Sequence, residues 1–168
     1  MGVDRCAAVL TYEGAGRELV ARLKYRNARS TLRWLASHMA ALADPSVEIV
    51  TWLPTTRERR RARGFDQAEL LAREIARRLR RPCRSSLVRA AGPAQTGRTL
   101  AERRIGPAFA VRGAIPARVL LVDDVITTGT TVAAAARALR GGGAIEISVV
   151  AAARTPLKRA RSAPENCA

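Results

Sequence analysis

Two adjacent carboxylates and a run of hydroxyl groups make residues 119–131 the stretch of the sequence best suited to chemistry. Residues 119–122 are apolar, which predicts a buried strand with Asp123 and Asp124 at its carboxyl end. A loop then leads into a predicted helix and contains Thr127, Thr128, Gly129, Thr130 and Thr131. Free backbone N–H groups at a helix N-terminus bind phosphate, and glycine allows the backbone to approach it closely. The pattern predicts a ribose 5-phosphate site, with the phosphate in the loop and the sugar hydroxyls on the carboxylates.

A simpler interpretation of this stretch is a strand that ends in an ordinary turn, with Asp124 as a solvated loop residue. One Asp after an apolar strand is common, whereas two adjacent Asp before a Thr-rich loop and a helix are not. The sequence contains no GxxxxGK[ST] motif and no GxGxxG motif after a strand. The glycines at 141–143 follow a predicted helix, so they are better explained as its end than as a cofactor loop.

Alternating strands and helices are expected along the whole chain. The apolar and β-branched runs that predict strands are residues 7–12, 47–53, 86–88, 109–111, 119–122 and 145–152. Helical spacing of apolar residues occurs at 17–25, 31–43, 67–80 and 130–140, and Asp66 is a plausible N-cap of the third helix. Residues 54–64 are a polar segment, residues 91–99 are a loop, and residues from 154 onward are a polar tail expected to fray. This order predicts one α/β domain over residues 1–168 with a mostly parallel sheet.

The charge of the chain is strongly positive and uneven. The formal net charge is +16, and 28 of the 30 basic residues are Arg. Residues 57–104 carry a net charge of +10. Nucleic acid, a small polyanion, or a general preference for Arg would each explain such an excess.

The cellular setting is predicted from what the sequence lacks. No apolar run approaches the ~18–20 residues that span a bilayer, and no signal peptide precedes the first strand. Cys6, Cys83 and Cys167 are too widely spaced for a zinc pair or a disulfide framework. We therefore expect a cytoplasmic protein with no membrane span.

Residues 119–131 are similar to the phosphoribosyl-pyrophosphate (PRPP) motif of type I phosphoribosyltransferases. The resemblance implies that Asp123 and Asp124 hold the ribose hydroxyls and that residues 127–131 hold the 5-phosphate. In the 6-oxopurine members an Asp stands where this chain has Thr127, so that substrate class is disfavoured. The loop is more similar to that of orotate phosphoribosyltransferases.

Further blocks resemble the ComF family of competence-protein-F-like phosphoribosyltransferases. They are Tyr12, residues 23–25 (LKY), residues 53–54 with the Arg-rich run to 63–72 (RGFDQAELLA), residues 95–97 (QTG) and residues 102–103 (ER). The family usually begins with a CxxC zinc module, which is missing from this sequence, so the chain starts after it or has lost it. It usually has Asn where Asp66 stands, and the segment between residues 103 and 109 is shorter than usual.

The resemblance implies a type I phosphoribosyltransferase fold, in which residues 1–45 contribute to a small hood over the site. It also implies Mg²⁺ bound mainly through the ligand, and a pyrophosphate loop for which Thr55, Thr56 and Arg63 are the candidates. A solvated basic loop is the alternative for the individual arginines. The sequence offers no general base, and His38 is assigned a structural role.

Two functions remain open from the sequence. One is transfer of a phosphoribosyl group from PRPP to an unknown acceptor. The other is a non-enzymatic accessory role in DNA uptake, with single-stranded DNA bound by the Arg-rich segment. A homodimer is left open in both cases.

Overall fold

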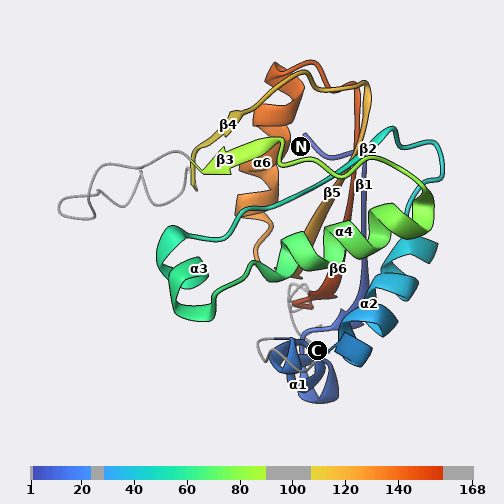
Figure 1. Cartoon of the computed structure of the whole chain (residues 1–168), viewed down its shortest axis with the longest axis vertical. Coiled ribbons are helices and arrows are strands. Elements are labelled where there is room, and N and C mark those ends of the chain that lie inside the picture. The colour runs from blue at the N-terminus through green and yellow to red at the C-terminus, as the bar shows by residue number, and fades with distance from the viewer. Residues whose placement is uncertain (1, 24–28, 90–106, 157–168) are drawn as a thin grey trace, which may run out of the picture.

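The computed structural model describes residues 2–23, 29–89 and 107–156. Its centre is a four-stranded parallel sheet in the order β1-β6-β5-β2 (Figure 1). The strands are β1 Arg5–Thr11, β2 Ile49–Trp52, β5 Arg118–Ile126 and β6 Glu146–Arg154. A separate antiparallel pair consists of β3 Leu87–Arg89 and β4 Phe109–Val111. The expected α/β fold with a parallel sheet is confirmed.

Helices cover both faces of the sheet. The helices are α1 Gly14–Arg22, α2 Arg29–Ala41, α3 Arg57–Arg63, α4 Gln67–Leu79 and α6 Thr130–Gly141. Figure 1 shows α6 on one side of the sheet and α4 with α2 on the other. None of these helices, in the part of the chain that the structure describes, is long and apolar enough to cross a membrane.

The two faces of the sheet form two hydrophobic cores because side chains alternate along each strand. Leu120 and Val122 of β5 pack in one core with Leu71 and Ile75 of α4. The neighbouring side chains of β5 point the other way, and Leu121 packs with residues of α6 in the second core. A parallel strand buried on both faces explains why residues 119–122 read as a continuous apolar run.

Most predicted boundaries differ from the structure by a few residues, and two differences concern the site. The strand predicted to end at residue 122 continues to Ile126, because β5 goes on pairing with β6 at Asp123 and Val125. The polar segment predicted at 54–64 contains α3, which Thr56 caps by accepting a hydrogen bond from the Arg59 N–H. Gly64 ends α3 in the left-handed conformation, at φ 78°. Hydrophobic periodicity does not predict α3, because this helix has no apolar face.

The N-terminal residues contribute to the sheet as well as to its cover. β1 pairs with β6 at the edge of the central sheet, and α2 packs against α4. A hood role stays a prediction for α1, from which Val20 reaches the cavity described below. The expected tail begins after Arg154, the last residue of β6, and its residues 157–168 are not among those described.

Gly16 permits the close approach of α1 to the end of β1. A Cβ atom at this position would overlap the backbone oxygen of Thr11, whereas a Cβ at Gly141 in α6 would meet nothing within 4 Å. We expect Gly16→Ala to lower the free energy of unfolding by about 1–3 kcal/mol through overpacking. Gly141→Ala is the control, and it should leave stability unchanged or raise it by up to about 1 kcal/mol. Urea unfolding of both variants tests this, and equal stability of the two would contradict the packing.

Candidate active site

A cavity of about 480 Å³ opens where β2 separates from β5. The last bond between these strands runs from the Leu53 N–H to the Val122 carbonyl. Beyond it β5 continues beside β6 alone, and the chain after Leu53 turns away into Pro54 and Thr55. Both of these residues line the cavity, as do Asp123 and Asp124 on the β5 side. The cavity therefore lies at the carboxyl end of the sheet, where α/β folds bind ligands.

Asp123 and Asp124 lie inside the last part of β5 rather than after it. Asp123 Oδ1 accepts a hydrogen bond of 2.8 Å from the Asp124 N–H, and Asp124 Oδ1 accepts one of 2.8 Å from the Val125 N–H. Burial raises the pKa of Asp123 well above its usual range, and the negative charge of Asp124 raises it further. The two carboxylates thus form a closely coupled acidic pair at the cavity wall.

The loop after β5 brings its hydroxyl groups to the start of α6. Thr127, Thr128, Gly129 and Thr131 line the cavity, and Thr130 joins them through a 2.9 Å hydrogen bond between its hydroxyl and that of Thr128. Gly129 is the N-cap of α6 and has φ 76°, a conformation that other residues adopt only with strain. A Cβ there would project into open space, so the glycine leaves room beside the helix N-terminus. This geometry suits a phosphate group.

The predicted pyrophosphate residues divide into two groups. Thr55 and Arg63 line the cavity. Thr56 instead uses its hydroxyl to cap α3, and it is not among the lining residues. Their binding roles stay predictions.

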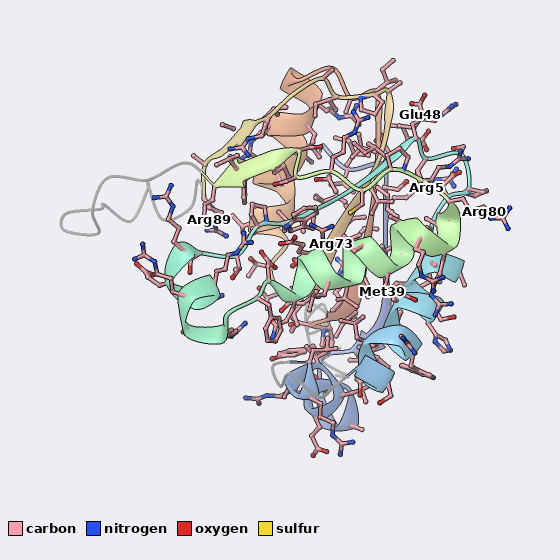
Figure 2. All side chains as sticks on the ribbon, in the orientation of Figure 1. Arg5, Met39, Glu48, Arg73, Arg80 and Arg89 are labelled. Carbon is pink, nitrogen blue, oxygen red and sulfur yellow. The ribbon has the colours of Figure 1, made fainter. Side chains whose placement is uncertain are left out.

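The cavity also contains two cationic side chains that are not among the predicted site residues, Arg59 on α3 and Arg89 at the end of β3. The Arg89 guanidinium lies 5.3 Å from the centre of the Phe109 ring. In Figure 2, Arg89 is near α3, whereas Arg80 is at the far end of α4. Burial lowers the pKa of Arg89, the positive charge of Arg59 lowers it further, and Asp123 opposes the shift. Within the described ranges, Arg59, Arg63 and Arg89 have no ion pair with a carboxylate.

Asp66 fixes the wall between β2 and α4. It is 5% exposed, and its two oxygens accept bonds from the Thr55 N–H (2.9 Å) and the Ala68 N–H (3.1 Å). An Asn here would offer one acceptor oxygen instead of two, so holding both backbone N–H groups in this way requires Asp. Burial raises the pKa of Asp66, although these backbone bonds oppose the shift.

Several residues quoted for the family resemblance lie outside the described ranges. They are Lys24, Tyr25, the QTG block at 95–97 and the ER block at 102–103. Of the two remaining residues of the first block, Tyr12 lines the cavity and Leu23 is buried in the core that contains Leu120. His38 contacts Trp34 on the exposed side of α2, with ring centres 4.2 Å apart, and is not part of the cavity.

Comparisons with known proteins identify the family of the chain. Residues 66–167 match the family model of the phosphoribosyl transferase domain, and the chain belongs to this family. It is 34% identical over 143 residues to competence protein F of Haemophilus influenzae, covering 80% of this chain and 59% of that protein. It is 28% identical over 139 residues to competence protein ComFC of Bacillus subtilis, covering 79% and 56%. The expected relation to ComF proteins is confirmed as distant homology, and the chain spans somewhat more than half the length of these relatives.

Solved structures support the fold. Glutamine phosphoribosylpyrophosphate (PRPP) amidotransferase from B. subtilis, complexed with ADP and GMP, superposes with a TM-score of 0.56 and 20% identity. The match covers 79% of this chain and 30% of that one. A structure described as the allosteric regulatory enzyme of purine biosynthesis gives the same values. At this identity the likeness concerns the fold alone.

The raised pKa of Asp123 predicts how stability depends on pH. Between the usual pKa and the raised one, the folded protein binds more protons than the unfolded chain, so stability falls as the pH rises through this interval. Asn at this position keeps an acceptor for the Asp124 N–H and cannot ionise. We expect Asp123→Asn to raise Tm by a few degrees at pH 8 and to lose this advantage towards pH 4.

Asp4 is the matched control for this experiment. The Ile147 N–H and Arg140 lower its pKa, so its contribution is present at neutral pH and is lost as the pH falls through the lowered pKa. Asp4→Asn should therefore lower Tm at pH 8 and have little effect near pH 2. Thermal melts from pH 2 to pH 8 measure both effects. A lower Tm for Asp123→Asn at pH 8 would contradict the burial of its charge.

Proposed function

We propose that this chain is a phosphoribosyltransferase that binds PRPP or ribose 5-phosphate with Mg²⁺ and transfers the phosphoribosyl group to an acceptor. The observation that carries the proposal is that one cavity combines a glycine-containing helix N-terminus, two adjacent carboxylates and three arginines. PRPP has a matching set of groups, which are a 5-phosphate, vicinal hydroxyls and a pyrophosphate. Membership of the phosphoribosyl transferase family supports this assignment.

The chemistry is displacement of pyrophosphate at C1 of the ribose. The bond from C1 to the pyrophosphate oxygen breaks and its electron pair leaves with the pyrophosphate, while the acceptor forms a new bond to C1 and gives up a proton. Asp123 and Asp124 would orient the hydroxyls, and the residues of the 127–131 loop would hold the 5-phosphate. Arg63, with Arg59 and Arg89, would stabilise the charge of the leaving group. Positioning and charge stabilisation would therefore account for catalysis.

The residues present are compatible with Mg²⁺ bound largely through the ligand. Among the described residues, no group of three or more His, Cys, Asp or Glu side chains is suited to hold a metal ion. Proteins commonly bind Mg²⁺ through one or two carboxylates together with substrate phosphates. Asp123 and Asp124 would lie near the ion and orient the ribose hydroxyls, and the ion would offset the charge of the pyrophosphate.

Ligand binding tests the proposal directly. We expect calorimetry to detect PRPP with Mg²⁺. The double variant Asp123→Asn with Asp124→Asn should weaken binding at least about 100-fold, since each lost hydrogen bond to a charged carboxylate is worth about 1.5–3 kcal/mol. Arg73→Gln on α4 is the control, because Arg73 pairs with Glu69 and does not line the cavity. Failure of both PRPP and ribose 5-phosphate to bind at millimolar concentration would overturn the proposal. Release of pyrophosphate in a screen of nucleobases and amines would identify the acceptor.

A second candidate function is binding of single-stranded DNA. The observation that favours it is the exposed Arg57 and Arg61 on α3, which make no carboxylate pair in the described part of the chain. On α4, by contrast, Arg73 and Arg77 are paired with Glu69 and Glu74. The names of the two competence proteins are consistent with a role in DNA uptake.

The DNA-binding candidate makes its own prediction. Replacing Arg57 and Arg61 by Ser should weaken binding to a single-stranded oligonucleotide and reduce the slope of log K against log salt by about 0.7 for each lost phosphate contact. Replacing the paired Arg73 and Arg77 by Ser removes the same charge and is the control. Fluorescence anisotropy between 50 and 200 mM salt measures both. Equal losses in the two variants would argue against a site on α3.

A further inference from the structure

Gln67 is the first residue of α4 and holds a buried hydrogen-bond donor with no partner. Its side chain is 5% exposed and lines the cavity. Oε1 accepts a 2.8 Å hydrogen bond from an Arg63 guanidinium nitrogen. Nε2 is the one buried side-chain polar atom, among the residues described, that makes no hydrogen bond.

The orientation of this amide follows from its partner. A guanidinium can only donate, so the atom that faces Arg63 must be the oxygen, and Nε2 must face away. A buried donor without a partner destabilises a protein, which is why folded proteins contain few of them. Leu or Met would fill the same space without this penalty. The retained amide therefore points to a partner that is present only when the cavity is filled.

The surroundings of Gln67 indicate what that partner is. Arg63, bonded to the same amide, and Arg59 both line the cavity and make no carboxylate pair in the structure as described. The neighbouring Asp66 ties the first turn of α4 to Thr55, so the amide is presented from a fixed helix end. The donors here are Gln67 Nε2 and the guanidinium groups of Arg59 and Arg63. A ligand that accepts a hydrogen bond from each must carry several acceptor oxygens and a negative charge. A diphosphate group has this chemistry.

We propose that Gln67 is a further ligand-binding residue, whose Nε2 donates a hydrogen bond to an oxygen of the pyrophosphate group while its Oε1 positions Arg63. This assignment rests on the proposed function and adds a neutral donor to its arginines. Nε2 is buried in the structure, so a small rotation of the side chain accompanies ligand binding. Because the bond goes to pyrophosphate, Gln67 distinguishes ligands that carry this group from ribose 5-phosphate.

Two variants and three probes test the role of Gln67. Gln67→Met keeps the length of the side chain without the donor, and Gln67→Glu keeps an acceptor for Arg63. We expect both variants to bind PRPP and pyrophosphate, each with Mg²⁺, about tenfold more weakly in calorimetry. Ribose 5-phosphate should bind as it does to the wild type. Glu74→Gln, on the same helix and outside the cavity, is the control and should change none of these affinities.

Two further measurements separate direct binding from a purely structural role. Gln67→Met removes the unpaired donor together with the Oε1 bond to Arg63, so its effect on the Tm without ligand is measured in an Arg63→Met background. There it should leave the Tm unchanged or raise it, because only the unpaired donor is lost. In an Arg63→Met background, Gln67→Met should still weaken pyrophosphate binding several-fold, since the bond from Nε2 to the pyrophosphate does not depend on the contact between Oε1 and Arg63.

The outcomes that overturn this assignment differ from those that overturn the proposed function. If the wild type binds PRPP and the Gln67 variants bind it equally well, the role of Gln67 is refuted and the proposed function stands. A loss of ribose 5-phosphate binding in step with pyrophosphate would refute the direct bond. So would either of two results in the Arg63→Met background, namely a lower Tm on adding Gln67→Met or no further loss of pyrophosphate affinity. If the wild type binds neither PRPP nor ribose 5-phosphate, both proposals fall.

Discussion

The separation of β2 from β5 after Leu53 is the constraint on which the site depends. As long as two parallel strands stay paired, no space exists between them for a ligand. β2 has four residues and β5 has nine, and β2 pairs only with the apolar first half of β5, at residues 119–122. β5 therefore extends beyond this neighbour, and Asp123 and Asp124 lie in the extension. The chain leaving β2 returns through α3 and α4, whose residues form the opposite wall.

The charges on the two walls are incomplete without a ligand. Asp123 is partly buried beside a second carboxylate, and Arg89 is partly buried beside a second arginine, so each group has an unfavourable neighbour of its own sign. Like charges brought together in a site of low polarity are stabilised by an ion of the opposite sign. Enzymes commonly accept such a loss of stability in order to bind charged ligands. The features that weaken the protein are thus the ones that the proposed binding of a phosphate ester and a cation would use.

Features that depend on neighbouring residues could be predicted from the sequence, whereas features that depend on contacts between distant residues could not. The buried strand, the acidic pair, the Thr-rich loop and the Asp66 cap were predictable because neighbours in the sequence determine them. The extension of β5 through Asp123 was missed because pairing with β6, rather than strand propensity, maintains it. Arg89 was missed because its place depends on how the β3–β4 pair packs near Pro54. The proposed role of Gln67 in ligand binding could not be predicted, because a side-chain amide without a hydrogen-bond partner can be recognised only in three dimensions.

The position of β1 has a consequence for how the protein is made. β1 lies near the start of the chain, but it pairs with β6, and Arg5 is opposite Ser148. During synthesis β1 must therefore wait for almost all of the described residues to leave the ribosome before it can join the sheet. Closing so long a loop is entropically slow compared with the pairing of β5 and β6, which one helix connects. Because Tyr12 follows β1 and lines the cavity, we expect the binding site to be among the last parts of the protein to assemble.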